Sequence, residues 1–140
     1  MNICLMASER KKELMVQFCT AYKTVLQHHN LYATATTGRL IADTLKLPVS
    51  LFLSHNQGGH QQVDARVSYN ELDMILIFTD PSQSSPVEDQ QLVNTIHLCD
   101  KNNVPIATNL ASAEMLILGL QQGNLDWREM LPAKKLLGQQ

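Results

Sequence analysis

Residues 74–81 read MILIFTDP, which is a run of five apolar residues followed by a polar turn. A run without polar alternation is typical of a parallel strand that is buried on both faces of a sheet. Similar short apolar runs occupy residues 3–7, 31–35, 49–53 and 104–107. Each run has the length of a buried strand, so the sequence predicts a central sheet built from these segments.

Helical patterns lie between these runs. Over residues 11–29, apolar side chains recur at steps of three and four, which predicts one amphipathic helix that ends near Asn30. Ser85 is expected to cap a further helix, with Glu88 placed to close a capping box, and residues 110–120 are rich in helix formers. Parallel strands need crossover connections. The alternation therefore predicts a three-layer α/β fold, with a mainly parallel sheet and helices on both faces.

The length and composition fit a single domain spanning residues 1–140. The chain has 140 residues, of which 44% are hydrophobic, and this is enough to build one covered core. A net charge of -2 provides no basic field for nucleic acid or an anionic membrane, so neither is expected as a partner. The three cysteines lack a CxxC spacing, which indicates a reducing compartment. Neither a signal peptide nor an apolar run near the roughly 18 residues of a membrane span is found, so we expect a cytoplasmic protein.

Polar residues follow the predicted strands at the edge where open α/β sheets bind ligands, beyond the carboxyl ends. Thr34, Thr36 and Thr37 precede a predicted helix over residues 39–45, so their hydroxyls and the helix N–H groups would face an anion such as phosphate. Alternatively, these threonines only finish a strand and cap a helix. Lys12 lies in the first turn of the first helix, where the helix dipole disfavours a cation and a bound anion would compensate. Otherwise it is an ordinary surface lysine.

Residues 54–62 read SHNQGGHQQ and follow the third predicted strand. Adjacent glycines, including Gly59, let backbone pass close to a ligand, while His55 and His60 supply donors, acceptors and a proton carrier near neutral pH. The alternative is an ordinary Gly-Gly turn with a histidine at a helix start. No pair among the five histidines shows a metal-ligand spacing with carboxylate or thiol support, so no metal is expected.

Asp80 comes directly after the run at residues 74–78 and before Pro81. A carboxylate at this edge can act as an acid or a base, or can orient another group. The alternative is an aspartate that caps a turn beside a proline.

Four segments together resemble the signature segments of the methylglyoxal synthase family in order and spacing. They are LYATATTG at residues 31–38, GGHQQ at 58–62, DP at 80–81 and PIATN at 105–109. The likeness covers nearly the whole chain. It implies a flavodoxin-like or doubly wound sheet, a homohexamer, and a lyase of a glycolytic bypass that converts dihydroxyacetone phosphate to methylglyoxal and phosphate. It also implies that neither a cofactor nor a metal is needed.

The residues that hold phosphate in that family all have counterparts in this sequence. The resemblance assigns this role to Lys12, Thr34, Thr36, Thr37 and Ser54. This agrees with the anion site that the threonines and the lysine predict on their own.

The position of the catalytic base departs from the family pattern. The aspartate that abstracts the substrate proton normally stands between Gly-Gly and Gln-Gln, where this sequence has His60. A histidine can accept a proton near pH 7. Its ring is larger than an aspartate side chain, however, and a displacement of about 1 Å can reduce the rate by about a hundredfold.

Other departures also lie around the chemistry. The family motif Ala-His-Asp before the first helix is ASE at residues 7–9, His55 stands in place of a glycine, and Val87 stands in place of a histidine. Asp89 is the nearest candidate for the second aspartate of the family, because this loop is one residue longer. Asp80 matches the aspartate of the Asp-Pro pair.

Two functions of different classes follow. The first is a lyase of altered or weakened activity, with His60 as the base, Asp80 in support and His55 as a hydrogen-bond donor. The second is a catalytically degenerate module that binds a small phosphorylated metabolite as a sensor or regulatory subunit, as the similar domain of carbamoyl phosphate synthetase does. A subunit that only assembles with an active homologue is a third interpretation.

Overall fold

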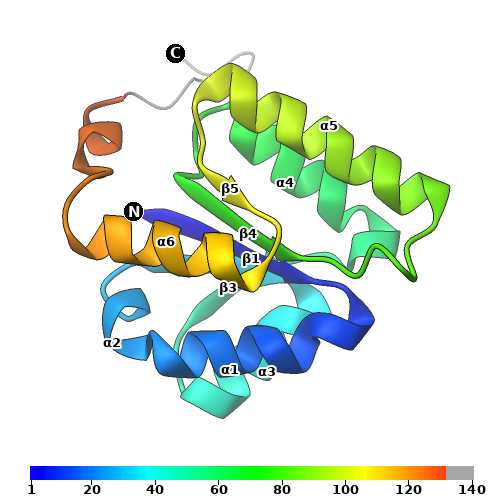
Figure 1. Cartoon of the computed structure of the whole chain (residues 1–140), viewed down its shortest axis with the longest axis horizontal. Helices are drawn as coiled ribbons and strands as arrows, with labels where there is room; N and C mark the ends of the chain where they lie inside the picture. Colours follow the sequence, from blue (N-terminus) through cyan, green and yellow to red (C-terminus); the bar gives the residue numbers. More distant parts are fainter. Residues whose placement is uncertain (132–140) are drawn as a thin grey trace.

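Five parallel strands form the centre of the computed structural model, which describes residues 1–131 (Figure 1). The strands lie in the order β3-β2-β1-β4-β5. Each of the five predicted apolar runs overlaps one strand, and β1 and β2 each begin one residue before the predicted run. Their bounds are Asn2–Ala7 for β1, Asn30–Thr34 for β2, Val49–Phe52 for β3, Met74–Phe78 for β4 and Ile106–Ala107 for β5.

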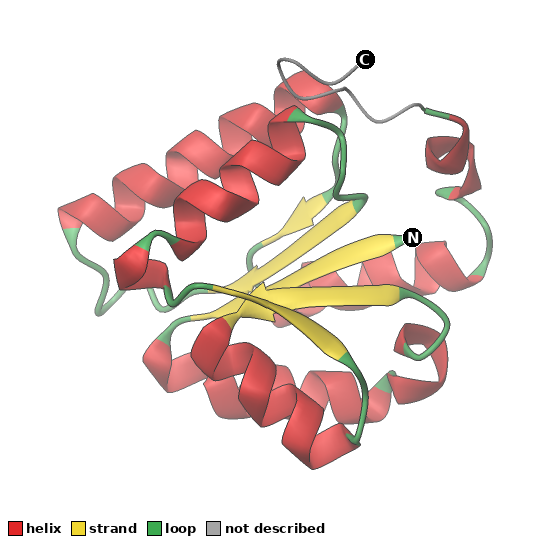
Figure 2. Ribbon diagram, turned by 180° about the vertical axis from the view of Figure 1, so that it is seen from behind, coloured by secondary structure: helices red, strands yellow, loops and turns green. Residues whose placement is uncertain are grey.

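Helices cover both faces of this sheet (Figures 1 and 2). One face carries α1 (Lys12–Ala21), α2 (Lys23–Leu26), α3 (Ala35–Leu45) and α6 (Leu110–Gln121). The opposite face carries α4 (Gly59–Ser68) and α5 (Pro86–Asn102). Short 3-10 helices occupy Glu9–Lys11 (η1), His55–Gln57 (η2) and Asp126–Met130 (η3). The predicted three-layer α/β fold is confirmed. The predicted domain also includes residues 132–140, which lie outside the described residues.

The side chains of the central strands contribute to two separate hydrophobic clusters. In β1, Ile3 and Leu5 pack into the cluster on the side of α1, whereas Cys4 and Met6 pack into the cluster on the side of α4. The same alternation runs along β4, whose five residues are all buried. Because successive side chains of a strand point to opposite faces, a continuous apolar run is what a sheet covered on both sides requires. No helix within residues 1–131 is long and apolar enough to cross a membrane.

The first helical region differs from its prediction as one helix that ends near Asn30. The helix is interrupted at Tyr22, where φ is -109° and ψ is 22°, and α2 ends at Leu26. Asn30 is the first residue of β2, and its N–H donates to the carbonyl oxygen of Met1 at 2.9 Å. The Asn30 N–H thus keeps a hydrogen-bond partner in the sheet although it is no longer part of a helix. Pairing with β1 therefore sets this boundary.

The predicted start of α5 is confirmed. The Ser85 hydroxyl accepts a hydrogen bond from the Glu88 N–H at 3.1 Å, and Pro86 is the first helical residue. The start of α6 is capped in the same way, because the Asn109 side chain accepts from the Ser112 N–H at 3.0 Å. Both helices therefore begin with one of their free N–H groups satisfied by a side chain.

Candidate functional site

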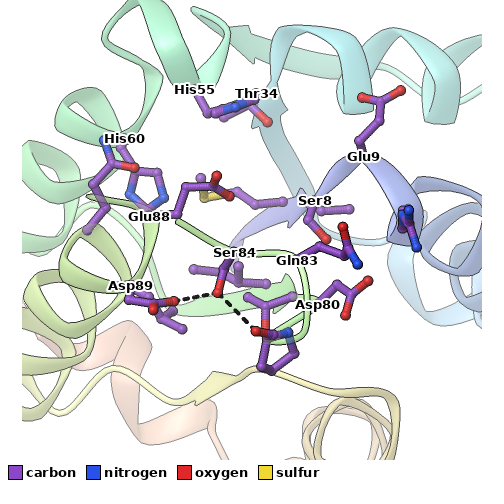
Figure 3. A pocket seen from close by; sticks show the side chains of 18 residues that line it. Ser8, Glu9, Thr34, His55, His60, Asp80, Gln83, Ser84, Glu88 and Asp89 are labelled. Carbon is purple, nitrogen blue, oxygen red and sulfur yellow. Dashed lines mark hydrogen bonds between the residues drawn. The ribbon is translucent and has the colours of Figure 1, made fainter. Parts of the chain in front are cut away.

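A cavity of about 450 Å³ opens at the carboxyl ends of β1 and β4. Chain order reverses between these two strands, since β2 and β3 extend the sheet to one side and β5 to the other. Such a switch point leaves a crevice that open α/β folds use for ligands. The cavity is lined by residues that follow β1, β2, β3 and β4 and by side chains of α4 and α5 (Figure 3).

His60 lies in the first turn of α4, is half-buried, and lines the cavity. Burial lowers the pKa of this imidazole below its usual value near 6.5, and nearby His55 acts in the same direction, while Asp64 opposes the shift. A buried, neutral ring is favoured because low dielectric penalises the charged form. His60 is therefore a neutral imidazole at pH 7, in the state that can accept a proton.

Asp80 follows β4 and lines the same cavity. The Ser82 hydroxyl and the Ser82 N–H both donate to its Oδ1, at 2.6 Å and 3.2 Å. The hydroxyl hydrogen bond is the largest cause of a lowered pKa for Asp80, and the positive charges of Lys11 and Arg10 act in the same direction. Asp80 is thus a carboxylate at neutral pH, and its Oδ1 atom accepts hydrogen bonds from Ser82.

Ser8 adds a hydroxyl at the base of the switch point. Its N–H donates to the Phe78 carbonyl oxygen at 2.9 Å, which continues the pairing of β1 with β4 by one residue. The Ser8 Oγ atom is buried and has no hydrogen-bond partner among the described residues. Because Ser8 lines the cavity, this unsatisfied hydroxyl is available to a polar atom of a ligand.

The three threonines at the end of β2 occupy different environments. Thr34 is buried and lines the cavity, as His55 does (Figure 3). It is the N-cap residue of α3, yet its side chain makes no capping hydrogen bond. Thr37 is buried within the first turn of α3, while Thr36 is exposed. The side-chain capping proposed as the alternative role for Thr34 is therefore not made, and N–H groups at the start of α3 lack a side-chain cap.

Lys12 does not line the cavity directly. Its Nζ atom forms an ion pair with the Glu9 carboxylate at 2.7 Å, and this hydrogen bond lowers the pKa of Glu9. Glu9 itself lines the cavity. The ammonium group is thus separated from the cavity by the Glu9 side chain, which is exposed.

Ser54 and Gly59 fix the start of α4 against the end of β3. Gly59 donates its N–H to the Ser54 carbonyl oxygen at 3.0 Å. A Cβ atom at Gly59 would lie 2.2 Å from the Leu53 carbonyl oxygen, so only glycine fits there. Gln62 completes the contact by accepting from the Leu53 N–H at 2.7 Å. The space that Gly59 leaves is filled by the protein's own backbone, and the result is a fixed position for His60.

Two acidic side chains of α5 also line the cavity, and the sequence pattern indicated only one of them. Asp89, the nearest candidate for the second aspartate of the family, lines it and accepts from the Ser84 hydroxyl at 2.6 Å (Figure 3). Glu88 is expected from the sequence to close a capping box, and its N–H does donate to the Ser85 hydroxyl, but its side chain lines the cavity. The signal available for Glu88 was its position in the first turn of the helix that follows β4. Within residues 1–131, no three His, Cys, Asp or Glu side chains are grouped so that they could hold a metal ion.

Comparison with known proteins identifies relatives over most of this chain. Residues 14–108 match the family described as MGS-like domain. A methylglyoxal synthase from Caldicellulosiruptor saccharolyticus is 49% identical over 135 residues, which cover 96% of this chain and 94% of that protein. One from Listeria monocytogenes is 46% identical over 130 residues, covering 93% and 96%.

A solved structure is also similar. The crystal structure of methylglyoxal synthase from Elizabethkingia anophelis NUHP1 superposes with a TM-score of 0.75 at 32% sequence identity. The match covers 83% of this chain and 76% of that one. The family resemblance and the fold class predicted from the sequence are both confirmed by these comparisons.

Proposed function

Because this chain belongs to the MGS-like domain family, we propose that it is a lyase that converts dihydroxyacetone phosphate to methylglyoxal and phosphate. The single observation that carries the proposal is the meeting of Thr34, His55, His60 and Asp80 in one cavity at the switch point. These residues come from three separate segments of the chain, which follow β2, β3 and β4. The relatives named above are methylglyoxal synthases, which supports the same reaction.

In the proposed reaction, neutral His60 removes a proton from the hydroxyl-bearing carbon of the substrate, which leaves an enediolate. The hydroxyl group on that carbon then becomes the aldehyde carbonyl as its proton passes to the phosphate, which leaves from the carbon next to the enediolate. The resulting enolate takes back the proton from His60 at carbon to give methylglyoxal. The base must be neutral before the first step, and the lowered pKa of His60 favours this state. Asp80 accepts a hydrogen bond from a substrate hydroxyl and so orients it, while His55 donates toward a substrate oxygen.

We propose that the leaving phosphate is held at the start of α3. Thr34 lines the cavity beside N–H groups that no side chain caps, and a helix N-terminus favours an anion. We also assign Thr36, Thr37 and Ser54 to this part of the site, whereas Gly59 contributes by leaving room for the Leu53 carbonyl oxygen at the start of α4. Lys12 joins when the anion displaces Glu9. Replacing Lys12 or Thr36 by alanine is expected to weaken phosphate binding more than about tenfold, or about 1.4 kcal/mol.

The test measures methylglyoxal and released phosphate from dihydroxyacetone phosphate, using wild type, His60→Ala and His60→Asp. The proposal expects turnover by wild type, loss of turnover in His60→Ala, and a decline in wild-type activity as His60 becomes protonated at acidic pH. Turnover by His60→Asp alone would instead identify a phosphate-binding regulatory module with an intact site and an inactive base position. An active alanine variant would exclude His60 as the base.

We also propose that the protein assembles as a homohexamer, as the family resemblance implies. Light scattering coupled to size-exclusion chromatography gives the mass directly, against 15.7 kDa for one chain. A mass of a single chain at micromolar concentration would contradict the assembly without affecting the proposed chemistry.

A further inference from the structure

His60 is connected to a polar group that the proposed reaction does not use. Its Nδ1 atom lies 3.4 Å from the hydroxyl of Thr95, and that hydroxyl lies 2.6 Å from Oδ1 of Asp64. Asp64 is one turn beyond His60 in α4, whereas Thr95 belongs to α5. The geometry points to Thr95 and Asp64 as positioning residues that hold His60 in one tautomer, with Nδ1 protonated and Nε2 free to accept the substrate proton. This role rests on the proposed function.

Thr95 is a polar residue at a buried position, where a hydroxyl must be compensated by hydrogen bonds. It is fully buried on α5, which packs on α4, and both helices contribute side chains to the same apolar cluster. An apolar residue of similar size would avoid the cost of burying a hydroxyl. The hydroxyl lies where it reaches two side chains of α4, Asp64 and His60.

The direction of the hydrogen bonds follows from the single hydrogen of the Thr95 hydroxyl. Two acceptors compete for it, namely Oδ1 of Asp64 at 2.6 Å and the Gln91 carbonyl oxygen at 3.1 Å. The bond to the carboxylate is shorter and is assisted by charge, so it takes the hydrogen. The Thr95 oxygen can then only accept from His60, which requires a hydrogen on Nδ1. A neutral imidazole has one N–H, so Nε2 is the free acceptor.

The charged groups around His60 come from three elements. Asp64 on α4 favours the protonated ring, His55 on η2 disfavours it, and Glu88 and Asp89 on α5 line the same cavity. Asp64 reaches His60 through the Thr95 hydroxyl and also through its charge. Removing the charge of Asp64 is therefore expected to lower the pKa of His60 further. Removing the Thr95 hydroxyl is expected to abolish the preference of His60 for the tautomer with hydrogen on Nδ1.

The first experiment reads the tautomer without using activity. Two-bond ¹H–¹⁵N correlation spectra of the histidine rings, recorded above the pKa of His60, distinguish a protonated Nδ1 from a protonated Nε2. His60→Gln identifies the signals. Wild type and Thr95→Ser are expected to show hydrogen on Nδ1, and Thr95→Val is expected to lose this preference. A wild-type ring with hydrogen on Nε2, or an unchanged spectrum in Thr95→Val, would overturn the inference.

The second experiment measures turnover of dihydroxyacetone phosphate by the same proteins. Thr95→Val is expected to lower kcat about tenfold or more with little change in KM, and Thr95→Ser to restore it, because a wrongly held tautomer disables a histidine base. Asp64→Asn is expected to move the acidic limb of the pH profile to lower pH. Thr20→Val is the matched control, since Thr20 bonds to the carbonyl oxygen four residues earlier, as Thr95 does, but lies exposed on α1.

The two experiments distinguish failure of the proposed reaction from failure of the positioning role of Thr95. If wild type shows no turnover, the proposed reaction fails, while the spectra still decide the tautomer of His60. If wild type turns over and Thr95→Val matches it in kcat and pH profile, the positioning role is excluded although the lyase stands.

Discussion

The buried guanidinium of Arg128 donates a hydrogen bond to the backbone carbonyl oxygen of Asn103, 25 residues earlier in the chain. The same group donates to the Asn70 side chain at 3.0 Å and lies 3.5 Å from the Asp73 carboxylate. Asn70 and Asn103 both have positive φ, at 57° and 54°, in the turns that precede β4 and β5. Arg128 therefore ties η3 to the end of the sheet opposite the cavity.

Replacing Arg128 by alanine is expected to lower the free energy of unfolding by about 2–5 kcal/mol, because buried carbonyl and carboxylate oxygens lose their donor. Arg128→Lys should recover only part of this, since an ammonium lacks the planar fork. Urea unfolding measures both changes. Arg39→Ala, on the exposed surface of α3, is the control and should change the value by less than about 0.5 kcal/mol. Equal values for the two alanine variants would contradict a structural role for Arg128.

Ser8→Ala should separate ligand affinity from stability. The Ser8 hydroxyl is buried without a partner among the described residues, so its removal should leave the ligand-free protein equally stable or more stable by up to about 1 kcal/mol. Binding of dihydroxyacetone phosphate should weaken about tenfold, or about 1.4 kcal/mol, if the hydroxyl bonds to the ligand. Calorimetric titration and thermal unfolding give the two values. Ser50→Ala, on exposed β3, is the control, and loss of stability in Ser8→Ala would show that Oγ has an internal partner.

Gly59 and Gly119 should respond to alanine with opposite signs. A Cβ atom at Gly59 meets backbone oxygen at 2.2 Å, whereas one at Gly119 in α6 meets only the Asn124 side chain at 3.9 Å. Gly59→Ala should therefore destabilise the protein by about 1–3 kcal/mol. Gly119→Ala should stabilise it by about 0.5–1 kcal/mol, because glycine is unfavourable inside a helix. Denaturant midpoints at equal m-values decide this, and a stabilised Gly59→Ala would refute the close contact with Leu53.

Stability should decline as the pH falls below the ordinary histidine range. Burial lowers the pKa of His60 and of His29, and the N-terminal ammonium, 2.9 Å from Nδ1 of His29, adds to the second shift. The unfolded chain then binds more protons than the folded one. The stabilising contribution is complete above the unfolded pKa near 6.5 and is lost as the pH falls through the lower folded values.

Urea unfolding between about pH 7.5 and about pH 5.5 measures that slope. His29→Gln should reduce it and leave the part due to His60. A slope that is unchanged in this variant would exclude His29 as a contributor.

Local signals in the sequence were sufficient for most of the fold. The uninterrupted apolar runs predicted the five strands, and Ser85 with Pro86 marked the start of α5. The end of the first helical region could not be placed, because the pairing of Asn30 with β1 decides it and that contact is made between distant segments.

The residues of the candidate site also fall into those that local sequence signals predict and those that depend on contacts between distant segments. His60 and Asp80 were found because they follow strands, and all residues in such positions converge on one edge of a parallel sheet. Thr95 was not found, because its relation to His60 arises only when α5 packs on α4. No spacing along the chain encodes that contact.

The close fit of Gly59 against the Leu53 carbonyl oxygen has a consequence for how such a protein can change over generations. The backbone at position 60 is fixed by its glycine neighbour and by the Gln62 contact to Leu53, and neither involves the side chain at position 60. Different side chains can therefore occupy position 60 while the surrounding backbone keeps its course. The fold at this point is independent of the residue type at position 60, whereas the contact of that side chain with Thr95 is specific to it.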